Sequence, residues 1–393
     1  MHSKITLKVI FLLLLGIVMA FAQMTVTVPS GLDIELGGEV ELELVDVEGA
    51  GGFDNKDLTF QKVKNRSPHM RIDKAVLETK IKYSENLDYT IEFRFDDNGA
   101  FVDKHYARLN MEDWNTRFEI GQNRPFIATG RGTEGYPLIG TAFWKGREFH
   151  ITSESELELG DDVKFDLGFS VAMKRPIESD DAAEDKSFKM LTYGDYTPKD
   201  GQTWEYGVKG GLDLFGLETM GWFYYGKLMD DYDWKYQLSF SLDPYNSFGD
   251  EKDKTHFWGG GRVTYEIGGL HARAEYIYGR DGLLSRDGAY VEGAYEFKEL
   301  PKILPIGNIT FKARTGYLNL ISKEDEDGNE LVWEYLAEPM SWSRKMTTLA
   351  AITKINDFIS LKAEYYILDE ETGSNNESSV DDNQGLIQIE FKF

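Results

Sequence analysis

The chain has 393 residues and a formal net charge of −25 at pH 7. It contains no cysteine, which excludes disulfides, thiolate metal sites and a cysteine nucleophile. A chain this acidic also lacks the basic surface that nucleic-acid binding requires. Its 39 glycines and 13% aromatic residues occur beside 28% charged residues, a mixture that suits strands with one apolar and one water-facing side.

The first residues have the pattern of a secretory signal. Lys4 and Lys8 precede an apolar run over residues 9–22, which ends in Ala20-Phe21-Ala22. A basic start, a short apolar run and a small-x-small end predict a signal peptide over residues 1–22. The run is shorter than the roughly 20 residues that span a bilayer, and a retained membrane anchor is the alternative.

Residues 23–393 are expected to form one domain built from amphipathic strands. Apolar and polar residues alternate along segment after segment, and no long segment has the three-and-four spacing of a helix. The predicted strands are about 9–13 residues long, longer than the usual 5–6 of soluble proteins and long enough to cross a bilayer at a tilt. Clear examples are residues 34–44, 75–83, 87–95, 163–171, 270–278, 309–317 and 359–367.

The connections between these strands alternate between short and long, as in barrels with short periplasmic turns and long external loops. In lipid a sheet must close on itself, because an open edge leaves unpaired amides. The short connections are residues 84–86, 112–114, 160–162, 215–217, 268–269 and 356–357; the long ones are 47–70, 123–146, 174–202, 320–342 and 369–383.

The fold class predicted from this pattern is all-β, a transmembrane antiparallel β-barrel. Both ends of the chain are expected on the same side of the membrane, which requires an even number of strands. The count is uncertain by one between Lys227 and His256, where a turn and a longer connection follow each other. We therefore predict 16 strands, with 18 as the alternative.

The last strand ends on an aromatic residue. It resembles the C-terminal signature of bacterial outer-membrane barrels, which implies recognition by the barrel assembly machinery. An amphipathic strand of a soluble β-sandwich or β-helix is the alternative. The apolar positions are Ile387, Ile389, Phe391 and Phe393, and Gln388, Glu390 and Lys392 alternate with them.

A more specific resemblance lies in residues 118–126, Phe-Glu-Ile-Gly-Gln-Asn-Arg-Pro-Phe. This stretch is similar to one in the phosphate-selective porin (O and P) family, where a strand ends in Gly-Gln and runs into a basic residue, Pro and Phe. Arg124 matches the basic position. The resemblance covers residues 70–150 and the C-terminal strand. It implies a 16-stranded, usually trimeric outer-membrane porin for anions or for general diffusion.

The third external loop is the first candidate for a pore constriction. In general porins this loop folds into the lumen, and here its glycines and aromatic residues allow a compact inward fold. A basic constriction favours anions, and phosphate is one candidate. Solvated loop charges, or contacts with anionic lipopolysaccharide, are the alternatives. Its basic residues are Arg124, Arg131, Lys145 and Arg147, against the single acidic Glu134.

The lumen wall is predicted to carry charges of both signs. These charges lie on the polar faces of the strands, where they either line a water-filled pore or form a screened network that keeps the wall hydrated. The basic candidates for contact with a solute are Arg94, Arg273, Lys312 and Arg314, and acidic residues such as Glu92, Glu275 and Glu364 alternate with them.

The function favoured by the sequence is passive diffusion of small hydrophilic solutes, with no covalent chemistry, cofactor or metal site. A structural or adhesive barrel without conductance is one alternative. An enzyme is another, and its nearest nucleophile–base pair is His150 with Ser153 or Ser155. Residues three or five apart on a strand are about 10 Å or more apart, which argues against that pair.

Overall fold

The computed structural model describes most of the chain after its first residues. No helix in the described part is long and apolar enough to cross a membrane. The predicted signal peptide, residues 1–22, lies outside the described residues. These are residues 25–27, 32–47, 51–54, 59–62, 68–96, 99–130, 132–135, 137–160, 163–181, 189–195, 203–228, 254–282, 284–298, 307–321, 323–324, 330–331, 343–371 and 383–393.

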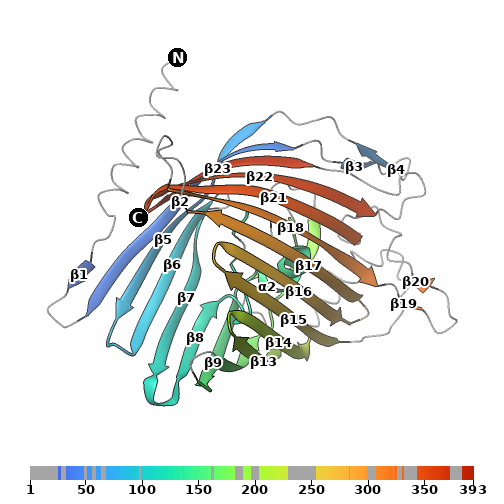
Figure 1. Ribbon diagram of the computed structural model, residues 1–393. Helices are drawn as coiled ribbons and strands as arrows, with labels where there is room; N and C mark the ends of the chain where they lie inside the picture. Colours follow the sequence, from blue (N-terminus) through green and yellow to red (C-terminus); the bar gives the residue numbers. More distant parts are fainter. Residues whose placement is uncertain are drawn as a thin grey trace.

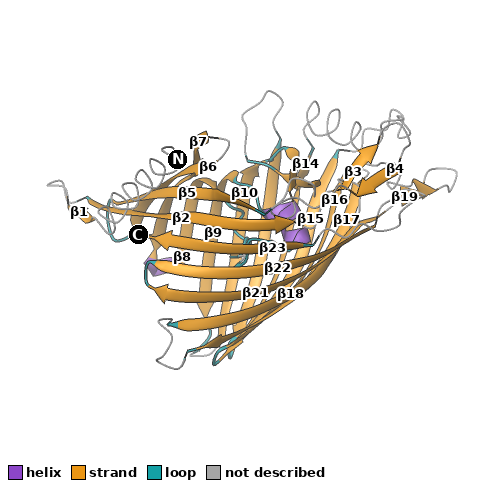
Figure 2. Cartoon of the chain, turned by 90° about the horizontal axis from the view of Figure 1, so that it is seen from above, coloured by secondary structure: helices purple, strands orange, loops and turns teal. Residues whose placement is uncertain are grey.

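Sixteen long strands form a closed antiparallel barrel (Figures 1 and 2). A short strand, β1 (Thr25–Thr27), pairs beside the start of the first of them. The barrel strands are β2 (Asp33–Val47), β5 (His69–Lys82), β6 (Leu87–Asp96), β7 (Gly99–Met111), β8 (Thr116–Asn123), β9 (Glu148–Glu158), β10 (Val163–Met173), β13 (Trp204–Leu214), β14 (Leu217–Lys227), β15 (Thr255–Ile267), β16 (Leu270–Asp281), β17 (Leu284–Phe297), β18 (Asn308–Ile321), β21 (Ser343–Asn356), β22 (Ile359–Glu371) and β23 (Gln384–Lys392).

The other elements lie in the connections. Three small hairpins are present in long connections: β3 (Gly51–Asp54) with β4 (Thr59–Lys62), β11 (Ile177–Asp181) with β12 (Lys189–Tyr193), and β19 (Lys323–Glu324) with β20 (Glu330–Leu331). The 3₁₀ turn η1 (Glu112–Trp114) joins β7 to β8, and the helix α2 (Leu138–Trp144) lies between β8 and β9. We call the end of the barrel with the short connections, such as residues 215–216 and 268–269, the turn end. The end with the long connections, such as residues 124–147, is the loop end.

The prediction of 16 strands is confirmed, and the alternative of 18 is wrong. The uncertain count arose between Lys227 and His256, and residues 229–253 lie outside the described part of the chain. The flanking strands β14 and β15 pair directly with each other along their whole length, from Leu217 opposite Tyr265 to Lys227 opposite Thr255. No barrel strand therefore stands between them.

The C-terminal strand closes the barrel against β2. Val40 lies opposite Phe391 and Leu44 opposite Ile387. Beyond the paired stretch, Gly38 N donates to Phe393 O at 2.9 Å, and Phe393 N donates to Gly38 O at 3.0 Å. A Cβ on Gly38 would lie 2.4 Å from the carbonyl oxygen of Val76 and 2.5 Å from the Phe393 ring. Glycine is therefore required where the terminal aromatic residue packs on the seam.

The two faces of the wall have opposite chemistry, in the reverse of a soluble protein. Charged residues such as Glu275, Glu292 and Arg314 are buried on the inner face. Large apolar residues are exposed on the outer face, among them Ile151, Phe169, Val208, Phe223, Val291, Phe311 and Leu349. A continuous exposed apolar wall of this kind is stable only in lipid. The prediction of a transmembrane barrel is confirmed, and the soluble β-sandwich or β-helix is wrong.

Two β-bulges each turn one extra acidic side chain inward. The pairing of β2 with β5 shifts register between Glu41 and Leu42 and skips Asp73. The pairing of β6 with β7 shifts between Glu92 and Phe93 and skips Asp103. A bulge places two consecutive residues opposite one and re-aims a side chain that strict alternation would send to the other face. Both carboxylates consequently reach the barrel interior.

A substitution to arginine on the outer face tests the orientation of the wall. Val208, near the middle of β13, is 39% exposed on the apolar face. Val208→Arg is expected to lower the free energy of unfolding by about 2–4 kcal/mol, because the cation lies near the bilayer midplane. The measurement is a urea titration of the protein folded into lipid vesicles.

Leu214→Arg is the matched control for this prediction. Leu214 is 36% exposed on the same face of the same strand, but it is the last residue before the turn. Near the interface the loss is expected to be about 0–1 kcal/mol. Equal losses for the two variants would contradict the assigned depth of β13.

Candidate functional site

The connection from β8 to β9 crosses the barrel interior, and we call residues 124–147 the inward segment (α2 in Figures 1 and 2). Arg262 on β15 donates from Nη2 to the Ile127 carbonyl at 2.7 Å. The amide of Gly135 donates to the Tyr366 hydroxyl on β22 at 2.9 Å. The segment therefore leaves β8 and contacts side chains on strands far around the barrel.

An aromatic sandwich anchors the end of α2. The Phe143 ring is fully buried, stacked 4.9 Å from Trp258 and 5.2 Å from Trp222. The edges of Tyr193 and Tyr224 close its other sides, with ring centroids at 5.8 and 5.2 Å. Burying a phenylalanine side chain contributes about 1.5–3 kcal/mol, and aromatic pairs add roughly 0.5–1.5 kcal/mol each. α2 is too short to be stable alone, so this contact supports it.

A buried polar network covers the sandwich at the loop end. His256 Nδ1 lies 2.7 Å from Asp281, and its other ring nitrogen contacts Glu205. Asp281 also binds Arg286 at 2.5 Å and accepts the Tyr193 hydroxyl. Because Tyr193 belongs to β12, the network holds the β11–β12 hairpin over α2. An unpaired buried charge is costly, and here each charge in the network has a partner.

Three of the predicted constriction cations, Arg147, Lys312 and Arg314, are paired with carboxylates. Arg147 is 6% exposed and forms an ion pair with Asp103, the bulge residue of β7. Arg314 Nη1 lies 3.2 Å from Glu292, and Lys312 Nζ lies 3.0 Å from the same carboxylate. Asp103 neutralises Arg147, whereas the single carboxylate of Glu292 is shared by Lys312 and Arg314, so these pairings reduce the positive charge that the sequence had suggested for anion binding.

The other predicted cations are placed as follows. Arg94 Nε lies 3.3 Å from Asp96 on the same strand. Arg273 Nη1 donates to the Gly130 carbonyl at 3.3 Å. The Arg124 amide donates to Asn123 Oδ1 at 2.8 Å, and the Lys145 carbonyl accepts from Arg147 Nη1 at 3.0 Å. Arg131 lies outside the described residues. The structure thus brings Arg273, Lys312 and Arg314 to the inward segment and leaves Arg94 on the wall.

Carboxylates also line the turn half of the lumen. A cavity of about 420 Å³ is bounded by β10, β13, β14, β15 and β16 and by Thr129 of the inward segment. Asp213 and Glu218 face it from directly opposite positions on β13 and β14, with Asp166 beside them on β10. Within the described chain, no salt bridge or side-chain hydrogen bond reaches these three carboxylates.

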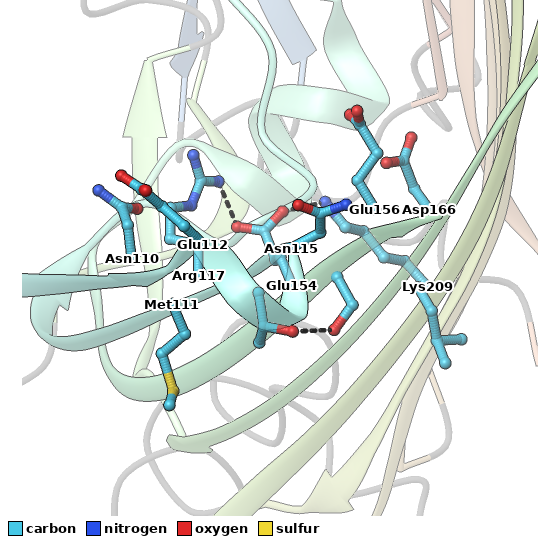
Figure 3. A pocket seen from close by; sticks show the side chains of 12 residues that line it. Asn110, Met111, Glu112, Asn115, Arg117, Glu154, Glu156, Asp166 and Lys209 are labelled. Atoms are coloured by element: carbon cyan, nitrogen blue, oxygen red, sulfur yellow. Dashed lines mark hydrogen bonds and ion pairs between the residues drawn. The ribbon is translucent and has the colours of Figure 1, made fainter. Parts of the chain in front are cut away.

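A second cavity of about 320 Å³ adjoins the first along the same wall (Figure 3). Glu154 at its centre contacts Arg117 from one side and Lys209 from the other. Glu156, Asp166 and Lys209 line both cavities. The two cavities thus lie along β8–β10 and β13–β16, and acidic residues outnumber basic ones in their lining.

The nucleophile–base pair of the enzyme alternative is excluded, because its side chains lie on opposite faces of the barrel wall. His150 is 1% exposed on the inner face, with Nε2 3.1 Å from Glu119 and Nδ1 3.0 Å from Glu148. Ser153 and Ser155 are odd-numbered positions of the same strand and lie on the opposite face, since side chains alternate along a strand. The imidazole cannot serve either hydroxyl as a base.

The fold is similar to solved outer-membrane barrels. The structural alignment with OmpT of Vibrio cholerae covers 94% of this chain and 100% of the OmpT chain, at 11% sequence identity and a TM-score of 0.54. The outer membrane channel DcaP of Acinetobacter baumannii covers 95% and 100% at 14% identity, with a TM-score of 0.55. The anion-selective porin from Comamonas acidovorans covers 92% and 100% at 11% identity, with a TM-score of 0.53.

At these identities the similarity shows the fold alone. No protein-family model matches the chain, and no curated protein matches its sequence. The resemblance of residues 118–126 therefore holds at the level of a 16-stranded porin-type barrel. The narrower assignment to the phosphate-selective family remains a prediction.

Removing the Phe143 ring tests the anchor of the inward segment. Phe143→Ala empties the space between Trp222 and Trp258, and such truncations of a buried ring cost about 3–5 kcal/mol. We expect amide hydrogen exchange in residues 138–144 to accelerate at least tenfold, because the loss falls on a short helix (~1.4 kcal/mol per factor of ten). Exchange is measured by mass spectrometry on the folded barrel.

Phe149→Ala serves as the control. Phe149 is the second residue of β9, just after the inward segment, and its ring lies 6.4 Å from that of His105. The variant removes the same ring without touching the sandwich. Exchange in α2 should remain at the wild-type rate; acceleration by both variants alike would show that the sandwich is not the anchor.

Proposed function

We propose that this protein is a passive channel of a bacterial outer membrane, through which small hydrophilic solutes and ions diffuse. The observation that carries the proposal is the hollow, carboxylate-lined side of the lumen next to the inward segment. An apolar outer wall and a charged, water-accessible interior are the parts that a diffusion pore requires, and selectivity comes from pore radius and lining charge.

The pore is proposed to prefer cations weakly. Asp166, Asp213 and Glu218 face the larger cavity without an ion pair in the described part of the chain. The basic candidates Arg147, Arg314 and Lys312 are by contrast paired with carboxylates. Unpaired charge in a low-dielectric wall raises the local concentration of counter-ions. The anion or phosphate preference implied by the family resemblance is the competing prediction.

The biogenesis and assembly of the protein follow from the same proposal. Residues 1–22 are proposed to direct export, and the barrel assembly machinery is proposed to read the outward-facing residues of β23. Ile387 and Ile389 on that strand are 47% and 37% exposed. One solved structure of OmpT from Vibrio cholerae is described as a trimer form. A homotrimer in contact with lipopolysaccharide is therefore proposed for this chain.

A structural barrel without conductance is the second candidate. It is favoured by the aromatic sandwich around Phe143, which fills part of the interior together with the β11–β12 hairpin. The two candidates differ in one measurable property, the passage of ions through a planar bilayer.

Single-channel recording under a KCl gradient tests the channel and its sign of selectivity. We expect discrete channels whose reversal potential lies on the potassium side, because the unpaired lining charge is negative. An absence of channels in correctly folded protein would favour the structural barrel. A potential on the chloride side would favour the family-based anion preference and direct attention to Arg124 and Arg131.

Neutralising the paired positions on β13 and β14 tests which carboxylates set the selectivity. The double variant Asp213→Asn, Glu218→Gln removes two charges that face the cavity and leaves shape and strand pairing in place. Its reversal potential is expected to move toward zero. Asp357→Asn, on the exposed turn between β21 and β22, removes a charge outside the cavity and should leave the potential unchanged.

A further inference from the structure

The outer face of β7–β9 carries three polar side chains, His105, Gln122 and Ser153, which we call the polar patch. His105 lies directly opposite Gln122, and Gln122 lies opposite Phe149. Directly opposite residues point to the same side of a sheet. Ile151, two residues after Phe149, is 53% exposed on the outer face, and side chains alternate along a strand. The whole row, and Ser153 on the next strand position of the same face, therefore points out of the barrel.

The polar patch lies at the depth of the hydrocarbon core. His105 is the seventh of the thirteen residues of β7, and Ser153 is the sixth of the eleven residues of β9. The middle of a barrel strand crosses the apolar band of the membrane, where acyl chains offer no hydrogen-bond partner. In the described part of the chain, no hydrogen bond or ion pair reaches the three side chains of the patch. The His105 ring packs beside that of Phe149 at 6.4 Å.

Other outward hydroxyls form pairs. Thr315 on β18 and Thr347 on β21 have their hydroxyl oxygens 2.9 Å apart. Thr116 on β8 and Ser155 on β9, nearer the turn end, are joined in the same way at 2.9 Å. A polar group in lipid must find its partner within protein. Since the polar patch has no such partner in its own described chain, we expect one on a neighbouring molecule.

The wall is also too low at this point to face lipid alone. β8 has eight residues, the fewest of the sixteen barrel strands. At about 3.4 Å per residue and a tilt of about 40°, such a strand rises roughly 20 Å, whereas the apolar band of a barrel is about 25 Å tall. Of its outward residues Thr116, Phe118, Ile120 and Gln122, the middle two are apolar. A protein neighbour removes this mismatch with the bilayer.

The chemistry of the face selects a second copy of this chain as the neighbour. Imidazole, amide and hydroxyl groups each donate and accept, so two identical patches can satisfy one another. The outward residues of β7–β9 include no acidic residue, lysine or arginine, whereas the whole chain has a net charge of −25. Two such acidic copies repel each other elsewhere and meet most closely at an uncharged face. A different partner would be expected to match charge, which this face does not offer.

We propose that the polar patch is a contact between copies of this chain, in which His105, Gln122 and Ser153 hydrogen-bond across the interface within the hydrocarbon core. The interface rests on the homotrimer proposed above, and it does not depend on whether the lumen conducts. Apolar residues around the patch complete the contact, among them Leu109, Ile120 and Ile151, which are 41%, 49% and 53% exposed.

Photo-cross-linking from single cysteines tests the interface. The chain contains no cysteine, so an introduced one is its sole thiol. Ser153→Cys, labelled with a benzophenone maleimide and irradiated in outer-membrane vesicles, is expected to give a product of twice the mass of the chain. Val291→Cys is the matched control, because Val291 is 57% exposed in the middle of β17, on the far side of the barrel. It should give lipid adducts and at least severalfold less of the doubled product.

A leucine double variant separates assembly from folding. His105→Leu, Gln122→Leu removes two polar groups of the patch and keeps the outer wall apolar. The barrel should therefore fold, while the oligomer dissociates on a gel at a temperature several degrees lower than the wild type. On a wall that faces lipid, leucine would leave assembly unchanged. Thr315→Val removes an outward hydroxyl from β18 and should not change the dissociation temperature.

Three results would overturn the interface: lipid adducts alone from Ser153→Cys, a covalent product with a different protein, or unchanged dissociation of the leucine variant. If the wild type is itself monomeric in the membrane, the homotrimer fails together with the interface. If the wild type is oligomeric and the doubled product arises from Val291→Cys instead, the position of the interface alone is wrong. Single-channel recording is a separate measurement, so the diffusion channel stands or falls independently.

Discussion

The whole structure depends on the requirement that backbone amides and carbonyls in lipid find partners within the protein. A sheet meets this requirement only when its first and last strands pair, as β2 and β23 do here. Closure in turn fixes the facing of every side chain. The outer positions must be apolar, so charged residues on the strands are directed to the lumen, where they meet water and one another.

The lumen charges make the irregular path of the inward segment possible. A segment without sheet partners has carbonyls to satisfy, and arginines on the wall supply the donors: Arg262 to Ile127, Arg273 to Gly130 and Arg314 to Gly135. Glu275 and Glu292 neutralise two of these arginines at 3.0 and 3.2 Å. Basic residues that look like an anion filter in the sequence therefore act first as supports for the loop.

The barrel was predictable because its signals are local. Alternation of period two, the alternation of short and long connections and the final Phe393 each appear within a short window of sequence. The site was much less predictable, because its contacts join distant residues; Arg314 and Thr133, for example, are 181 positions apart. The bulges at Asp73 and Asp103 were also hidden, since an extra residue in one strand is recognised only from its pairing with the neighbouring strand. Asp213 could have been found, because it shares a face of β13 with Lys209.

In the proposed channel, the position of the inward segment determines which part of the wall controls passage. The segment packs against β14–β18 and β21–β22, where its carbonyls and Phe143 are held, and the two cavities described above lie along β8–β10 and β13–β16. A solute on that side passes Thr129 and then the carboxylates of β10, β13 and β14. The segment thus sets the width of the path, whereas the facing wall sets its charge. Under the proposed cation preference, the basic composition of the loop is a poor guide to selectivity in this barrel.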